Sequence, residues 1–212
     1  MLIFKNKQSQ ISISGISDRW RSSLLATAML ITLLFLAGPG CDQSSKLRDF
    51  GIDTDFQMSD QDGAAFSSGQ LRGKTVWLYF GFTRCPDVCP GTLAKLARAY
   101  NMLDFRRENL QAVMITVDPE HDTPERLKAY LDYFDLPLIG LNADLDYTRT
   151  VAAQFGANFE RQILNSETGE YTVDHSTRVF LIDPEGRVRY AFAFEDSATQ
   201  IASVTGLLLP LY

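Results

Sequence analysis

Histidine and cysteine are scarce in this chain: its 212 residues include two histidines, His121 and His175, and three cysteines, Cys41, Cys85 and Cys89. A structural zinc site usually takes four such ligands, commonly as cysteine pairs, so a zinc site of that kind is disfavoured. An excess of basic residues is also missing, because 20 lysines and arginines stand against 26 acidic residues, for a net charge of −6. Nucleic acid is therefore not an expected partner.

A long apolar run is also lacking near the N-terminus. The run Leu24–Ala37 has fourteen residues, whereas a membrane-spanning helix needs about 20. Basic residues precede the run, and small and turn-forming residues follow it, which is the layout of a secretory signal. We therefore interpret residues 1–40 as a signal or membrane-targeting segment, with an uncleaved anchor as the alternative.

Cys41 makes the interpretation of this segment more specific. It directly follows the apolar run and a small residue, an arrangement similar to a bacterial lipoprotein signal, in which the cysteine thiol is lipidated. Such signals usually have leucine three residues before the cysteine, where this chain has Gly38, and Asp42 resembles an inner-membrane retention signal. We expect lipidation of Cys41, a tether over residues 41–49, and a domain on the periplasmic side of a bacterial inner membrane.

Residues 50–212 have the patterns of one globular α/β domain, in keeping with the chain's 45% apolar and 22% charged residues. Strand and helix patterns alternate from residue 75 onward. We expect strands at 75–80, 111–117, 137–141, 178–182 and 187–194, helices at 90–107, 123–134, 146–155 and 197–209, and a hairpin within 56–66. This order predicts a thioredoxin-like fold, with a central mixed sheet flanked by helices and preceded by the hairpin. The segment between the strands expected at 111–117 and 137–141 also suggests a capping box, in which Asp122 or Thr123 caps a helix and Glu125 lies in its first turn.

The segment FTRCPDVCP places Cys85 and Cys89 between the first central strand and its helix. Residues four apart share one face of a helix, so the two sulfurs can form a disulfide or bind one metal ion. The N-terminus of a helix also favours the thiolate, which is the form that does both. A permanent disulfide would close a very small loop and stabilise the fold little. Thiolates suit copper(I), and a nearby imidazole extends the fit to copper(II).

His175 is the candidate for that imidazole. It lies in the segment VDHS, just before the expected strand at 178–182. In a thioredoxin-like sheet the loop before this strand lies against the cysteine loop, so we expect His175 beside Cys85 and Cys89. His121 lies in the loop after the second central strand, and we interpret it as a solvated loop residue.

Three segments together, FTRCPDVCP, TVDPEHDTPERLKAY and VDHS, resemble the Sco/SenC family over roughly residues 50–210. The resemblance implies that Cys85, Cys89 and His175 are copper ligands for Cu(I) and Cu(II). It also implies a role in assembling the copper A centre of cytochrome c oxidase, by delivering copper or by reducing the cysteines of that centre. The implied partner is the copper A subunit of the oxidase or another copper chaperone.

Two other enzyme classes are compatible with the cysteines. An extracytoplasmic thiol–disulfide oxidoreductase would use Cys85 and Cys89 as a redox pair, although such enzymes usually have the spacing C-x-x-C. A peroxiredoxin-like peroxidase would have threonine three residues before the attacking cysteine, whereas Thr83 is two before Cys85 and Pro86 is three before Cys89. A binding scaffold with incidental cysteines is the least favoured reading.

Overall fold

The computed structural model describes residues 47–210 of the chain. These residues belong to one compact unit that spans Gln43–Tyr212. The expected signal segment at residues 1–40, Cys41 and most of the expected tether lie outside the described residues. Within residues 47–210, none of the helices combines the length and the apolar character that a membrane span requires.

A mixed sheet of seven strands forms the centre of the domain, in the order β2-β1-β5-β4-β3-β8-β9. Strand β3 runs parallel to β4 and antiparallel to β8, and β4 runs parallel to β5. The strands are β1 (Gln57–Asp60), β2 (Ala65–Ser67), β3 (Thr75–Gly81), β4 (Leu110–Thr116), β5 (Leu138–Asn142), β8 (Val179–Ile182) and β9 (Val188–Phe192). The expected mixed sheet and the hairpin before it, formed by β1 and β2, are confirmed.

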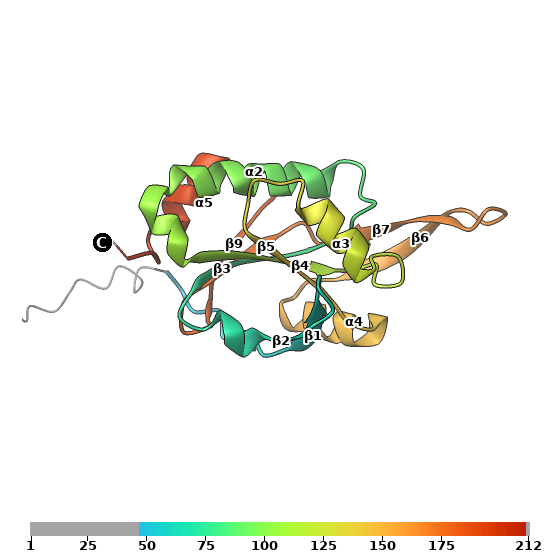
Figure 1. Ribbon diagram of the computed structural model, residues 1–212, viewed down its shortest axis with the longest axis horizontal. Helices are drawn as coiled ribbons and strands as arrows, with labels where there is room; N and C mark the ends of the chain where they lie inside the picture. The colour runs from blue at the N-terminus through green and yellow to red at the C-terminus, as the bar shows by residue number, and fades with distance from the viewer. Residues whose placement is uncertain (1–46, 211–212) are drawn as a thin grey trace, which may run out of the picture. The chain divides into compact units, whose positions relative to one another are not determined.

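Helices cover the sheet on both faces. Figure 1 shows α2 and α5 together over one face and α4 on the other. The helices are α2 (Val88–Met102), α3 (Pro124–Leu131), α4 (Leu145–Gln154) and α5 (Ala198–Thr205), with short 3-10 helices η2 (Ser68–Leu71) and η3 (Asp104–Asn109). This arrangement confirms the expected thioredoxin-like α/β fold.

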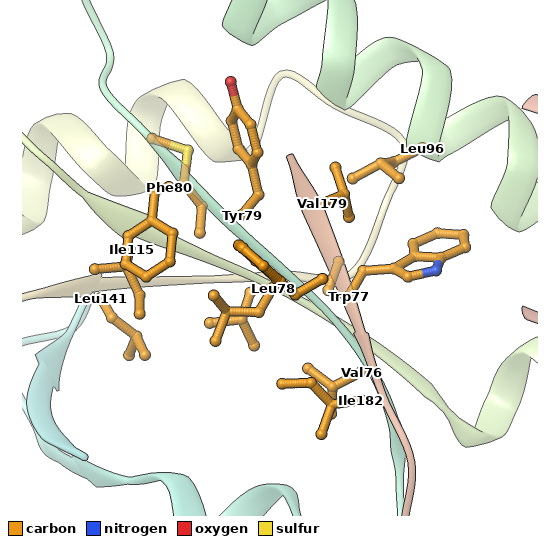
Figure 2. Close-up of a cluster of buried hydrophobic side chains, with 14 of the residues drawn as sticks. Val76, Trp77, Leu78, Tyr79, Phe80, Leu96, Ile115, Leu141, Val179 and Ile182 are labelled. Atoms are coloured by element: carbon orange, nitrogen blue, oxygen red, sulfur yellow. The ribbon is translucent and has the colours of Figure 1, made fainter. Parts of the chain in front are cut away.

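The core is built around β3, in which all seven residues are buried. A strand covered on both faces has a continuous apolar sequence, which is why TVWLYF predicts it. Figure 2 shows Trp77 and Tyr79 directed to the side where Leu96 of α2 lies, while Val76 and Leu78 point to the other side. The arrangement follows from the alternation of side chains along a strand, and it brings the Tyr79 hydroxyl to the helix that carries Cys89.

A second sheet, which the sequence patterns did not predict, consists of the strands β6 (Phe159–Asn165) and β7 (Glu170–His175). The two strands are antiparallel, and Figure 1 shows them as an arm that extends away from the central sheet. Most residues of β6 are exposed, and the exposed residues include the apolar Ile163 and Leu164. The apolar periodicity that reveals a half-buried strand is therefore absent from this segment.

Three helices end three or more residues before the expected residue. The helix predicted at 90–107 ends at Met102, because Asp104 adopts a left-handed conformation with φ of 56° and a 3-10 turn follows. Of the two expected caps, Asp122 and Thr123, Thr123 is confirmed as the N-cap, with its side chain accepting a hydrogen bond from the Arg126 amide, so the capping box from Asp122 to Glu125 is wrong. Asp122 is instead fully buried. Helices α3 and α5 also end three and four residues before the expected 134 and 209.

Candidate metal centre

The two cysteines lie where the chain turns from β3 into α2. Cys85 is half-buried in the loop, and Cys89, the second residue of α2, is completely buried. Both are free thiols. The Cys89 backbone amide donates a hydrogen bond to Cys85 Sγ over 3.3 Å. The first amides of a helix have no partner within the helix, so one of them is available to hold the Cys85 sulfur.

His175 is the last residue of β7, whereas the sequence suggested that it lies in a loop. Its Nδ1 lies 3.0 Å from the carbonyl oxygen of Ser176. A carbonyl can only accept a hydrogen bond, so Nδ1 of the neutral ring carries the proton and Nε2 presents a lone pair. That Nε2 lies 3.4 Å from Cys89 Sγ. The ring also packs edge-on against Tyr79 and Phe82, which restricts its orientation.

The structure thus brings the three residues predicted as ligands into one group. The two sulfurs and one imidazole nitrogen all lie within 4.8 Å of one another. Donors bound to one ion at about 2.3 Å each are at most about 4.6 Å apart, so small side-chain movements would let this group hold an ion. Two thiolates and an imidazole are soft and borderline donors, and this set fits copper in both common oxidation states.

The two sulfurs have opposite acid–base behaviour. The pKa of Cys85 is lowered to about 3, chiefly by a hydrogen bond from the Cys89 thiol, while burial opposes the shift and backbone hydrogen bonds assist it. The same interaction with Cys85, together with burial, raises the pKa of Cys89. At neutral pH the pair therefore holds one proton, with the thiolate on the more accessible Cys85.

Tyr79 contacts the buried sulfur of Cys89. Its hydroxyl donates a hydrogen bond to Cys89 Sγ over 3.3 Å. Burial raises the pKa of Tyr79, so the hydroxyl keeps its proton and remains a donor. Sequence reasoning treated Tyr79 only as a core residue. Its role at the site could have been inferred from the alternation along β3, because Tyr79 faces the helix whose second residue is Cys89.

Two buried aspartates after β4, which sequence reasoning also missed, hold the loop before Cys85. The Asp122 carboxylate accepts hydrogen bonds from the Thr83 amide at 3.0 Å and the Thr83 hydroxyl at 2.6 Å. Asp118 pairs with Arg84 at 3.0 Å. A usable signal was present, since β3 and β4 are parallel and the residues that follow them meet at one edge of the sheet. His121 lies nearby, with Nδ1 3.1 Å from Arg126, outside the three-residue donor group.

Comparisons with known proteins place the chain in a family. A model of the SCO1/SenC family matches residues 44–208 of the chain. An SCO2-like protein of Rickettsia prowazekii is 34% identical over 184 residues, which are 85% of this chain and 90% of that protein.

Solved structures of similar proteins share the fold. The structure of ScoI from Bradyrhizobium japonicum with copper bound has a TM-score of 0.68 and 32% identity, and the match covers 75% of this chain and all of that one. The crystal structure of a SCO1/SenC family lipoprotein from Bacillus anthracis has a TM-score of 0.66 and 28% identity, and the match covers 76% of this chain and 97% of that one.

Proposed function

The chain belongs to the SCO1/SenC family, and from that premise we propose that it is a copper-binding metallochaperone. In this proposal it delivers copper to the copper A site of cytochrome c oxidase, or reduces the cysteines of that site, and Cys85, Cys89 and His175 are the copper ligands. The observation that carries the proposal is the grouping of two sulfurs and an imidazole nitrogen within 4.8 Å. The copper-bound ScoI structure supports the choice of metal.

Each residue of the site has a distinct part in this proposal. Cys85 offers a thiolate at neutral pH, because its pKa is lowered to about 3. Cys89 has to lose its proton when metal binds, and the Tyr79 hydroxyl then donates to the new thiolate. His175 presents Nε2 in the required tautomer, because Nδ1 faces the Ser176 carbonyl. Copper supplies a soft acceptor for both sulfurs, so binding competes with protons and with disulfide formation.

Anaerobic copper titration of the reduced chain tests the ligand set, with the second histidine as a matched control. Wild type should bind one copper ion per chain in either oxidation state. His175→Ala should retain Cu(I), which two thiolates satisfy, and lose most of its affinity for Cu(II), which prefers additional nitrogen ligands. His121→Ala should behave as wild type. If His175→Ala bound Cu(II) as tightly as wild type does, His175 would not be a ligand.

Thiol–disulfide exchange is the second candidate function, and the difference between the two sulfurs favours it. Cys85 is the more accessible sulfur and has the low pKa, as an attacking thiolate requires. Its thiolate would attack one sulfur of a partner disulfide and release the other as a thiolate. Cys89, after losing its proton, would then displace the second partner sulfur. The products are two reduced partner cysteines and an oxidised Cys85–Cys89 pair.

A trapping experiment separates the two functions. The Cys89→Ser chain lacks the resolving sulfur, so an oxidised copper A domain should accumulate as a mixed disulfide with Cys85 if exchange occurs. The wild-type chain should release two thiols per chain without any copper. Copper transfer to a reduced copper A domain, with no mixed disulfide trapped from the oxidised one, would favour delivery over reduction.

The proposal includes attachment to a membrane. Residues 1–40 would direct export, Cys41 would carry the lipid, and residues 41–49 would link it to the domain on the periplasmic side of the inner membrane. The Bacillus anthracis relative described as a lipoprotein supports the lipid attachment. Mass spectrometry of membrane extracts should find a chain that starts at diacylglyceryl-modified Cys41, and Cys41→Ser should abolish that species. An intact wild-type chain that still begins with Met1 would indicate an uncleaved anchor instead.

A further inference from the structure

Asp118 is the centre of a polar cluster that links three separate segments. Its side chain is completely buried. The Tyr171 hydroxyl lies 2.8 Å and 3.1 Å from its two oxygens and donates a hydrogen bond to the carboxylate. Arg84 reaches the same carboxylate at 3.0 Å, and Arg161 approaches it at 3.5 Å. We use the name Asp118 cluster for Asp118, Arg84, Arg161 and Tyr171.

Aromatic contacts reinforce these bonds. The guanidinium carbon of Arg84 lies 4.2 Å from the centroid of the Tyr171 ring, and that of Arg161 lies 4.1 Å from it. Both distances are in the range of favourable cation–π contacts. The two arginines are about one-third exposed, at 37% and 33%, while the carboxylate they share is inaccessible. The buried negative charge and the tyrosine ring therefore hold both arginines in place, and Glu120 also pairs with Arg161 at 2.7 Å.

The members of the Asp118 cluster come from the segments that have to meet to form the metal centre. Arg84 directly precedes Cys85, and Asp118 follows β4. Arg161 and Tyr171 belong to β6 and β7, the arm that ends with His175. Tyr171 and His175 are four apart on one strand, and Arg161 pairs in register with Val173 between them. Since side chains alternate along a strand, Tyr171, Arg161 and His175 share one face of the arm.

The arm needs such an attachment. Within residues 47–210, strands β6 and β7 pair with each other and form no ladder with the seven-stranded sheet. A two-stranded hairpin is marginally stable on its own in water. Phe159 and Val173 of the arm are buried in the hydrophobic core, and the hydrogen bonds and ion pairs to Asp118 add a polar link between the arm and the cysteine loop.

We infer that the Asp118 cluster is a latch that positions the arm so that His175 Nε2 faces the two cysteine sulfurs. The inference rests on the proposed function and deepens it, because the latch decides how well the site retains Cu(II). Two thiolates hold Cu(I) without the arm, whereas Cu(II) depends on the imidazole. Tyr171 and Arg161 are positioning residues that act on the metal through His175.

Tyr171→Phe tests the latch with little change in volume. The variant keeps the aromatic ring that both arginines contact but loses both hydroxyl contacts to Asp118. We expect Cu(II) affinity to fall about ten-fold, the effect that changes around a metal ligand commonly have, with Cu(I) affinity unchanged. The sulfur-to-Cu(II) charge-transfer band should shift as well. Tyr133→Phe is the control, since Tyr133 is 86% exposed and should tolerate the same change without effect.

A double variant shows whether the effect passes through His175. Adding Tyr171→Phe to His175→Ala should cause no further loss of Cu(II) affinity, because the residue that the latch positions is already absent. If Tyr171→Phe lowered Cu(I) and Cu(II) affinity equally, or had its full effect in the His175→Ala background, the latch would be refuted. Arg161→Gln provides a second variant and should shift the two affinities in the same selective way.

A measurement without copper separates this inference from the proposed function. The nitrogen and proton resonances of the His175 ring should shift in Tyr171→Phe and stay unchanged in Tyr133→Phe, because the ring changes its surroundings when the arm is released. Unchanged His175 resonances in Tyr171→Phe would overturn the latch even if copper binds as proposed. If the wild-type chain bound no copper while the His175 resonances still shifted in Tyr171→Phe, the proposed function would be overturned and the latch would stand.

Discussion

Alanine at Gly81, the last residue of β3, should destabilise the fold and disturb the metal centre together. A methyl carbon at this position would lie 2.6 Å and 3.2 Å from two ring carbons of Tyr79 and 3.3 Å from Cys89 Sγ. Carbon atoms in ordinary contact are about 3.5–4.0 Å apart, so the Tyr79 ring would have to move by about 1 Å. Because Tyr79 is 1% exposed, that movement displaces its neighbours.

The expected cost follows from this lack of space. Adding a methyl group to a well-packed core typically costs about 1–3 kcal/mol. We expect the upper part of that range for Gly81→Ala, because the same movement stretches the hydrogen bond from Tyr79 to Cys89. Cu(I) affinity should fall in parallel, since the added methyl group pushes on the sulfur of Cys89, a proposed ligand.

Urea unfolding of the reduced chain measures the stability, and competition with a Cu(I) chelator measures the affinity. Gly91→Ala is the matched control, because Gly91 is an exposed residue of α2 whose added methyl carbon would meet nothing within 4 Å. That variant should be more stable than wild type by about 0.5–1 kcal/mol, since alanine is the better helix former. If Gly81→Ala unfolded at the wild-type urea concentration and bound Cu(I) normally, the packing argument would be refuted.

Three further predictions concern single groups. Ultraviolet thiolate absorbance of Cys85 should persist in mild acid, because its pKa is about 3, and Cys89→Ala should raise that pKa by removing the main hydrogen-bond donor; a wild-type value near 9 would contradict this. Tyr79→Phe should lower Cu(I) affinity about ten-fold in a chelator competition, and unchanged affinity would show that the hydroxyl does not support the Cys89 sulfur. Burial raises the pKa of Asp183, but hydrogen bonds from the Arg187 amide and two arginine side chains outweigh it and lower the pKa. Asp183 therefore stabilises the fold above its unfolded pKa and loses this effect as the pH falls through its folded pKa. In urea unfolding, the free energy of unfolding of Asp183→Asn should fall less steeply with decreasing pH than that of wild type. An equally steep fall would count against this role of Asp183.

The sequence by itself determined the elements with strong local patterns. The buried strand Thr75–Gly81 follows from a continuous apolar run, and the hairpin β1–β2 was also predictable. The elements with weak patterns were not predictable. The arm β6–β7 is mostly exposed, so no apolar periodicity reveals it, and α2 ends at Met102 because of one residue with positive φ.

The metal centre divides in the same way between local and tertiary causes. Cys85 and Cys89 are four residues apart at the start of a helix, so their proximity is a property of the local chain. His175 lies 86 positions from Cys89, and its approach to 3.4 Å depends on contacts between distant segments. The arm that carries His175 is oriented by Asp118 and its partners, whose charges and hydrogen bonds come from separate segments of the chain. The sequence alone therefore predicts which residues form the donor group, whereas the folding of distant segments onto one another decided how those residues face one another.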